Sequence, residues 1–140
     1  MVNSAFGLEY PRPLPPNIVM VGPMLPPVVE PLTNEVNDWL SDGSPVVYVN
    51  LGTIAIATSN QLTRMYEAFA DASFRVWWIL RSQQQSVPVP VATNIRIDVW
   101  GPPLLAVLKH PSVRAFVSHC GINSAQESLA AGTPIVGIPM

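Results

Sequence analysis

From residue 45 onward, β-branched apolar runs alternate with stretches of helical spacing, and this alternation constrains the fold more than any other feature. Residues 46–51 read VVYVNL, a composition typical of a strand that is buried on both faces. Residues 59–72 predict a helix, because they place apolar side chains at helical spacing: Leu62, Met65, Tyr66 and Phe69. Strands that alternate with helices form right-handed βαβ units. The sequence therefore predicts an α/β fold with a doubly wound parallel sheet.

Later segments continue the same alternation. Further strands are predicted at residues 75–80, 95–100, 115–118 and 135–138, and further helices at residues 103–108 and 123–131. In a sheet ordered 3-2-1-4-5, the first and fourth strands are neighbours whose connections run in opposite directions, and ligands bind beyond the carboxyl ends of such a pair. The loops that follow these two strands, residues 51–53 and 119–122, are the polar glycine loops of the chain.

Residues 1–44 differ from the rest because they are rich in proline: of 16 prolines in the chain, eight lie at or before Pro31. Proline removes backbone donors and fixes φ, so this region is expected to be extended and irregular. A short strand at residues 18–21 and a helix at residues 34–40, capped by Thr33 or Asn34, are the elements expected there. We predict residues 1–44 to be an interdomain linker and residues 45–140 to be the folded domain.

Size, charge and cysteine content exclude several classes of protein. A length of 140 residues allows one domain with a core, and a net charge of −2 gives no electrostatic footprint for nucleic acid. The single cysteine, Cys120, excludes an internal disulfide and a cysteine metal cluster and favours the cytoplasm. No apolar run approaches the ~20 residues that span a bilayer. Residues 1–16 lack the basic and apolar regions of a signal peptide.

The segment around residues 119–127 carries groups suited to a phosphate. Gly121 allows a sharp turn, and the helix that opens at Asn123 or Ser124 would present free N–H groups and about half a positive charge. His119 can donate a hydrogen bond to the same anion. Spacing alone leaves a second interpretation open, since residues 123–126 and 124–127 both fit a capping box that would satisfy these N–H groups internally.

Trp100 ends the predicted third strand, roughly 14 Å from the fourth if strands are about 4.8 Å apart. A nucleoside diphosphate can span that distance, and stacking a base on an indole contributes about 1–3 kcal/mol. The alternative is a core tryptophan. That is the role expected for Trp77 and Trp78, which cannot both face one side of a strand.

A longer motif combines these features. It consists of Trp100-x-Pro102, His119-Cys120-Gly121-x-Asn123-Ser124-x-x-Glu127, Gly132-x-Pro134 and Pro139. This motif resembles the signature of the UDP-glycosyltransferase family, and residues 8–22 and 49–53 also resemble the family's interdomain stretch and first C-domain strand. The resemblance implies two facing Rossmann-like domains. The chain would then be a truncated C-terminal domain, with residues 45–140 as an incomplete UDP-sugar-binding Rossmann-like domain.

The resemblance also implies a role for each residue of the motif. Trp100 would stack on uracil, and the Gly101 backbone would bond the base edge. The turn at Gly121 would present the diphosphate ligands, which are Thr53, His119, Asn123 and Ser124. Glu127 would accept hydrogen bonds from the ribose hydroxyls. No catalytic residue is expected in this chain, because the family's general base belongs to the N-terminal domain.

The function implied is metal-independent, inverting transfer of a hexose from a UDP-sugar to a hydroxyl of a small, lipophilic acceptor. No cofactor is expected beyond the donor itself, and the sequence contains no Asp-x-Asp motif for a cation. The 140 residues alone are expected to be inactive. A non-catalytic nucleotide-binding fragment or pseudoenzyme shares every residue above and stays open. A glycoside hydrolase is disfavoured, because no facing pair stands out among Glu67, Asp71, Asp98 and Glu127.

Overall fold

The computed structural model describes residues 1–4, 7–53, 57–80 and 92–138. Its elements are α1 (Asn34–Leu40), β1 (Val46–Asn50), α2 (Ser59–Ala70), β2 (Arg75–Ile79), β3 (Ile95–Asp98), α3 (Leu104–Leu108), β4 (Val113–Ser118), α4 (Ile122–Ala131) and β5 (Ile135–Gly137). Within these residues the strands form one parallel five-stranded sheet in the order β3-β2-β1-β4-β5. The predicted α/β fold and the predicted strand order are confirmed.

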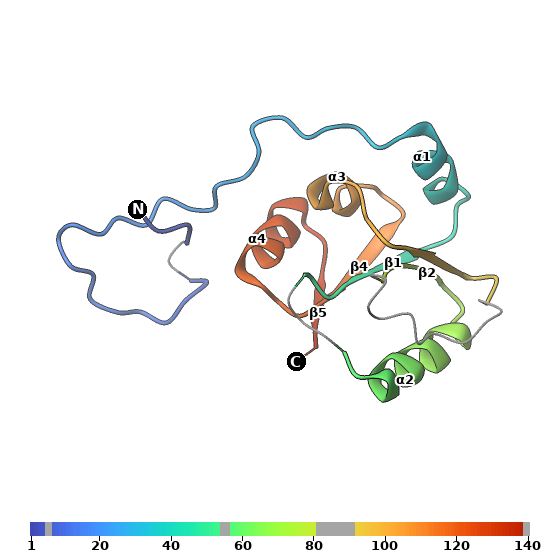
Figure 1. Cartoon of the computed structure of the whole chain (residues 1–140). Coiled ribbons are helices and arrows are strands. Elements are labelled where there is room, and N and C mark those ends of the chain that lie inside the picture. The colour runs from blue at the N-terminus through green and yellow to red at the C-terminus, as the bar shows by residue number, and fades with distance from the viewer. Residues whose placement is uncertain (5–6, 54–56, 81–91, 139–140) are drawn as a thin grey trace.

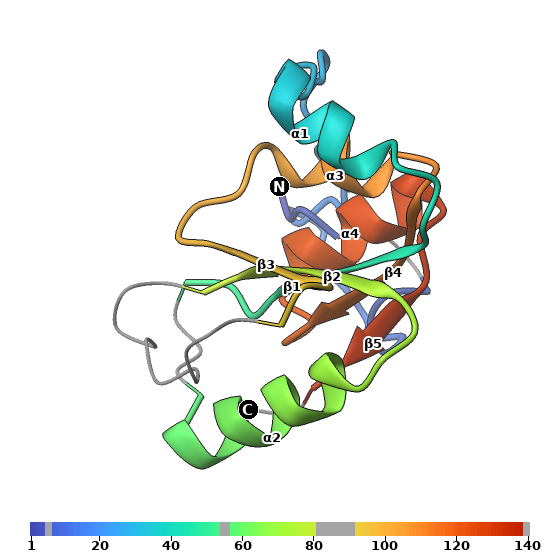
Figure 2. The same cartoon turned by 90° about the vertical axis from the view of Figure 1, so that its right-hand side faces the viewer.

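Helices cover both faces of the sheet, as Figures 1 and 2 show, with α2 on one face and α1, α3 and α4 on the other. Adjacent strand residues point to opposite faces. Trp77 therefore joins the core under α1 and α3, whereas Trp78 joins the core against α2. Both indoles are almost fully buried, which confirms that these two tryptophans are core residues.

The predicted helix at residues 34–40 forms as α1 and packs on the sheet. Thr33 caps it by accepting a hydrogen bond from the Val36 amide, and Leu40 is fully buried. The Arg75 guanidinium lies 3.6 Å from the centre of the Trp39 ring and donates to the Trp39 carbonyl at 2.7 Å. The helix that ends the proline-rich region is thus part of the hydrophobic core, while the division at residue 44 stays a prediction.

Element ends differ from the predicted ones by a few residues where tertiary contacts decide them. The strand expected at residues 115–118 begins at Val113, because Val113 pairs with Val46 before a register shift brings Ala115 opposite Val47. The strand expected at residues 18–21 is a single bridge between Val2 and Met20. None of the described helices combines the length and apolarity needed to cross a membrane.

The far end of α4 is tied to α3 by buried hydroxyl groups. Gly132 closes the helix in the left-handed conformation, with φ at 72°. The Thr133 hydroxyl donates to the Leu108 carbonyl at 2.6 Å, and the Ser128 hydroxyl donates to the Thr133 carbonyl at 2.6 Å. These bonds fix the direction in which the other end of α4 points, and that end lies beside the carboxyl ends of β1 and β4.

Candidate functional site

A cavity of about 300 Å³ lies at the switch point between β1 and β4. Its lining comes from the two glycine loops and the first turn of α4: Gly52, Thr53, His119, Gly121, Ile122, Asn123 and Ser124. The structure thus brings together all the residues that the resemblance assigned to the diphosphate.

The His119 ring is held between two glycines. A Cβ atom on Gly52, where φ is +80°, would overlap Cε1 of that ring, and a Cβ on Gly121 would stand 2.7 Å from its Nε2. Only glycine at both positions leaves room for the imidazole. The Nδ1 atom of His119 is buried, and it has no hydrogen-bond partner within the part of the chain that the structure describes. The ring position is therefore set by backbone packing.

The start of α4 corrects the capping interpretation. The helix begins at Ile122 with Gly121 as its N-cap, and no side chain makes a capping hydrogen bond. Asn123 and Ser124 lie inside the first turn, two and three residues after the N-cap, so the capping boxes expected at residues 123–126 and 124–127 do not form. The first N–H groups of α4 consequently lack a side-chain acceptor beside the cavity.

The loop between β4 and α4 is bent sharply at Cys120. Its φ of 60° makes it the one non-glycine residue with positive φ among those described. The Cys120 amide donates to the Ser118 hydroxyl at 3.2 Å, which stabilises the bend. A non-glycine residue in this conformation carries strain, and such strain clusters at functional sites.

Glu127 lies one helical turn beyond Asn123 and lines a second cavity, of about 310 Å³. The other lining residues come from α4 and the N-terminal segment: Asn3, Met24, Leu25, Pro26, Asn123 and Gln126. Asn123 belongs to both cavities, so they adjoin. Partial burial raises the pKa of the Glu127 carboxyl.

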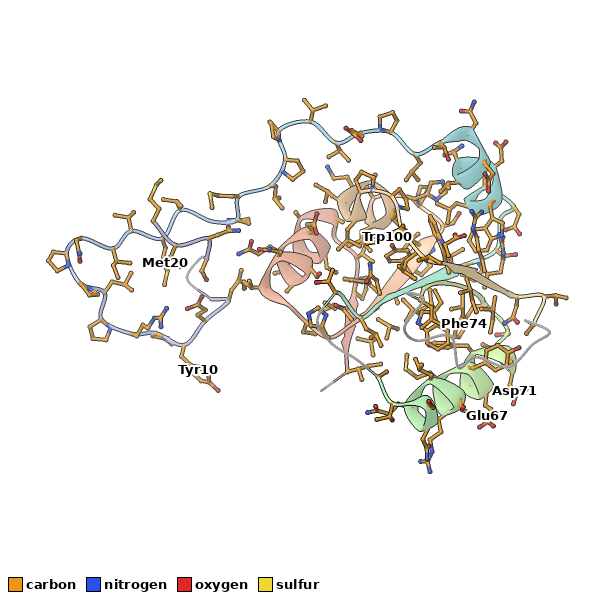
Figure 3. All side chains as sticks on the ribbon, in the orientation of Figure 1. Tyr10, Met20, Glu67, Asp71, Phe74 and Trp100 are labelled. Carbon is orange, nitrogen blue, oxygen red and sulfur yellow. The ribbon has the colours of Figure 1, made fainter. Side chains whose placement is uncertain are left out.

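Trp100 and Gly101 follow β3 and line neither of these cavities. The Trp100 side chain is 69% exposed, so the alternative of a core tryptophan is wrong for this residue. Figure 3 labels it on the α3 side of the sheet. A Cβ on Gly101 would overlap the Tyr48 hydroxyl, and burial raises the pKa of that hydroxyl. The tight packing of Gly101 fixes the backbone that carries Trp100.

Sequence reasoning missed some residues that shape the site. The sequence placed Gly52 in a loop but did not show that its missing side chain makes room for the His119 ring. The Gly52 amide donates a hydrogen bond to the Asn50 side chain at 2.9 Å, which marks a tight turn. Asn3 and Gln126 meet across 123 positions of sequence, and no local pattern signals that contact. Among the described residues no three His, Cys, Asp or Glu side chains converge on a common point.

Comparisons with known proteins bear on this site. The family model described as UDP-glucoronosyl and UDP-glucosyl transferase matches residues 1–140. Mouse UDP-glucuronosyltransferase 3A1 is 39% identical over 142 residues, which cover 99% of this chain and 27% of the mouse protein. UDP-glycosyltransferase 1 of Phaeomoniella chlamydospora is 34% identical over 151 residues, which cover 100% of this chain and 31% of the fungal protein. The chain thus spans about a third of such relatives or less.

Solved structures agree with these relatives. A UDP-glucose:anthocyanidin 3-O-glucosyltransferase in complex with UDP superposes with a TM-score of 0.71 at 31% identity, covering 83% of this chain and 27% of the other. A UDP-glucosyltransferase from Polygonum tinctorium that glucosylates indoxyl reaches a TM-score of 0.79 at 27% identity, covering 99% of this chain and 34% of its own. With the match along its whole length, the chain belongs to the UDP-glucuronosyl and UDP-glucosyl transferase family.

Proposed function

We propose that this chain is the donor-binding part of a UDP-sugar glycosyltransferase that transfers a hexose to a hydroxyl of a small, lipophilic acceptor. The observation that carries the proposal is the cavity at the switch point. It combines an uncapped helix N-terminus with a histidine held between two glycines. Helix N-termini favour anions through free N–H groups and the helix dipole. A glucosyltransferase of similar fold has been solved in complex with UDP.

Each part of UDP would then have its own place. The diphosphate would occupy the cavity lined by Thr53, His119 and the first turn of α4. Glu127, whose carboxylate borders the adjoining cavity, would accept hydrogen bonds from the ribose hydroxyls. Trp100, exposed after β3, would offer its ring to uracil, with the Gly101 backbone beside the base edge.

The same residues would assist the chemistry by stabilising the leaving group. When the bond between the anomeric carbon and UDP breaks, negative charge grows on the diphosphate. N–H groups at the start of α4 and a donor nitrogen on His119 would stabilise that charge by hydrogen bonds, because they already lie at the cavity before the reaction. On this basis we propose that the transfer is metal-independent. A single displacement from the opposite face of the sugar inverts the anomeric carbon. It needs a general base, which we place outside these 140 residues.

The chain contains two histidines, and they provide a matched test. His119 lines the cavity, whereas His110 follows α3 and its Nδ1 accepts a hydrogen bond from the Ser112 amide. We expect His119→Ala to weaken UDP binding by about 1.5–3 kcal/mol, the range for a hydrogen bond to a charged group. His110→Ala should leave UDP affinity unchanged. Isothermal titration calorimetry of the full chain with UDP and with uridine measures both.

Two results would contradict the proposal: no UDP binding by the wild-type chain, or equal losses from the two histidine variants. Product analysis with UDP-hexoses, with and without EDTA, tests transfer separately. We expect the 140 residues alone to bind UDP without transferring sugar. Transfer by a longer protein that contains them should survive EDTA and yield the inverted anomer.

A further inference from the structure

Asn3, close to the N-terminus, is bonded to α4 and to a second stretch of the N-terminal segment at once. Its side-chain Oδ1 accepts a hydrogen bond from the Met24 amide at 2.7 Å, and its backbone carbonyl accepts one from Gln126 Nε2 at 2.9 Å. Its side-chain Nδ2 donates to Asn123 Oδ1 at 3.4 Å. In Figure 1 this segment forms the loop beside α4. Asn3 therefore joins three segments that are distant in sequence.

Close packing holds Asn3 in this position. The Val21 amide donates to the Val2 carbonyl at 3.0 Å, and the Gly22 amide donates to the Ser4 carbonyl at 3.1 Å. A Cβ on Gly22 would stand 2.6–2.8 Å from atoms of Asn3 and Ser4, so only glycine allows the two stretches to approach this closely. Gln126 is 2% exposed, so the hydrogen bond that its side-chain amide donates to the Asn3 carbonyl satisfies a buried polar group.

The bond from Asn3 orients the amide of Asn123. A side-chain amide is planar, and its acceptor oxygen and donor nitrogen point in different directions from the same carbon atom. Because Oδ1 of Asn123 accepts from Asn3, the Nδ2 donor is the end left for the cavity at the switch point, which Asn123 also lines. A diphosphate offers only acceptor oxygens there. The opposite orientation would turn an amide oxygen toward the anion.

We propose that Asn3 is a positioning residue of the nucleotide site, which holds Asn123 with its amino group facing the diphosphate. The inference rests on the proposed function, since it requires a nucleoside diphosphate in the cavity. It adds a residue outside the signature motif, and it makes the N-terminal segment part of the site. Asn3 would act through Asn123 without touching the ligand itself.

A double-mutant cycle in the full chain tests this role, with Asn3→Ala, Asn123→Ala and the double variant titrated with UDP and with uridine. Releasing Asn123 should weaken UDP binding about threefold to tenfold, the value of one ordinary hydrogen bond. Uridine binding should change less than twofold, because uridine has no phosphate. In the Asn123→Ala background, Asn3→Ala should cause no further loss. Asn17→Ala is the matched control, an exposed asparagine of the same segment that lines neither cavity.

Asn3→Asp keeps the shape of the side chain and the acceptor for the Met24 amide, but replaces the donor to Asn123 by a negatively charged acceptor. It serves if Asn3→Ala does not fold: repulsion of the diphosphate by the new charge persists in the Asn123→Ala background, so the part of the affinity loss that disappears in that background is the part transmitted through Asn123. Equal losses for UDP and uridine, additive losses in the cycle, or no loss at all would overturn the inference while the proposed function stands. If the wild-type chain does not bind UDP, the proposed function fails and the inference fails with it.

Discussion

Gly52 and Gly43 form a natural matched pair for testing how the His119 ring is held. Both have φ in the left-handed region, at +80° and +92°. A Cβ added at Gly43 would meet no atom within 4 Å, whereas a Cβ at Gly52 would overlap the His119 ring. Alanine at either position therefore introduces the same backbone strain, but only Gly52→Ala displaces the imidazole.

The two effects can be sized separately. An alanine forced into the left-handed region costs about 1–2 kcal/mol of folding free energy, so both variants should lose at least that much stability, and Gly52→Ala should lose more because its Cβ also overlaps the His119 ring. Displacing His119 removes a donor to a charged diphosphate, which is worth about 1.5–3 kcal/mol of binding free energy. The dissociation constant for UDP should therefore rise by a factor of roughly 10 to 150 in Gly52→Ala and stay unchanged in Gly43→Ala.

Urea denaturation gives the stability of each variant, and calorimetric titration with UDP and uridine gives the affinities. Uridine, which lacks the diphosphate, should bind both variants like the wild type. The reasoning is refuted if Gly52→Ala is folded and binds UDP with wild-type affinity. It is refuted equally if the loss is the same for uridine, because the substitution would then disturb more than the position of His119.

Two further substitutions separate binding from stability. Trp100→Ala should weaken binding of UDP and of uridine by about 1–3 kcal/mol, as measured by titration. Trp77→Ala should instead lower the melting temperature. If both variants are folded and lose the same affinity, base stacking on Trp100 is contradicted. Glu127→Gln should weaken binding of UDP and uridine without lowering the melting temperature, because burial raises the pKa of Glu127 and so disfavours its charged form in the fold. Wild-type uridine affinity should fall as acidification protonates Glu127, starting at a higher pH than for an ordinary carboxyl; the same pH profile in Glu127→Gln would exclude this carboxylate as the cause.

Local pattern and chain connectivity were enough to predict much of the fold. The β-branched run at β1 and the helical spacing of α2 are properties of neighbouring residues, and short right-handed connections then leave few strand orders. The same logic placed Thr53 and His119 at one point of the sheet, where the structure has them. Opposite faces for Trp77 and Trp78 followed from the two-residue period of a strand.

Long-range contacts account for what sequence reasoning missed. The spacing from Asn123 to Gln126 is that of a capping box, yet both side chains bond to Asn3, which lies 120 and 123 positions away. The proline content of residues 1–44 indicated a linker, and nothing local shows that Trp39 would pack beneath the Arg75 guanidinium. In both cases the contact is made with a partner distant in sequence, which no local pattern identifies.

The central position of β1 has a consequence for synthesis of the chain. β1 is the first strand of the sheet to be made, and it pairs with β2 on one side and β4 on the other. β2 follows directly after α2, whereas β4 comes only after β3 and α3. At about 5–20 residues per second, one edge of the nascent central strand stays open for several seconds. During that interval the apolar run of β1 is a template for wrong pairing, which a chaperone bound to the nascent chain would prevent.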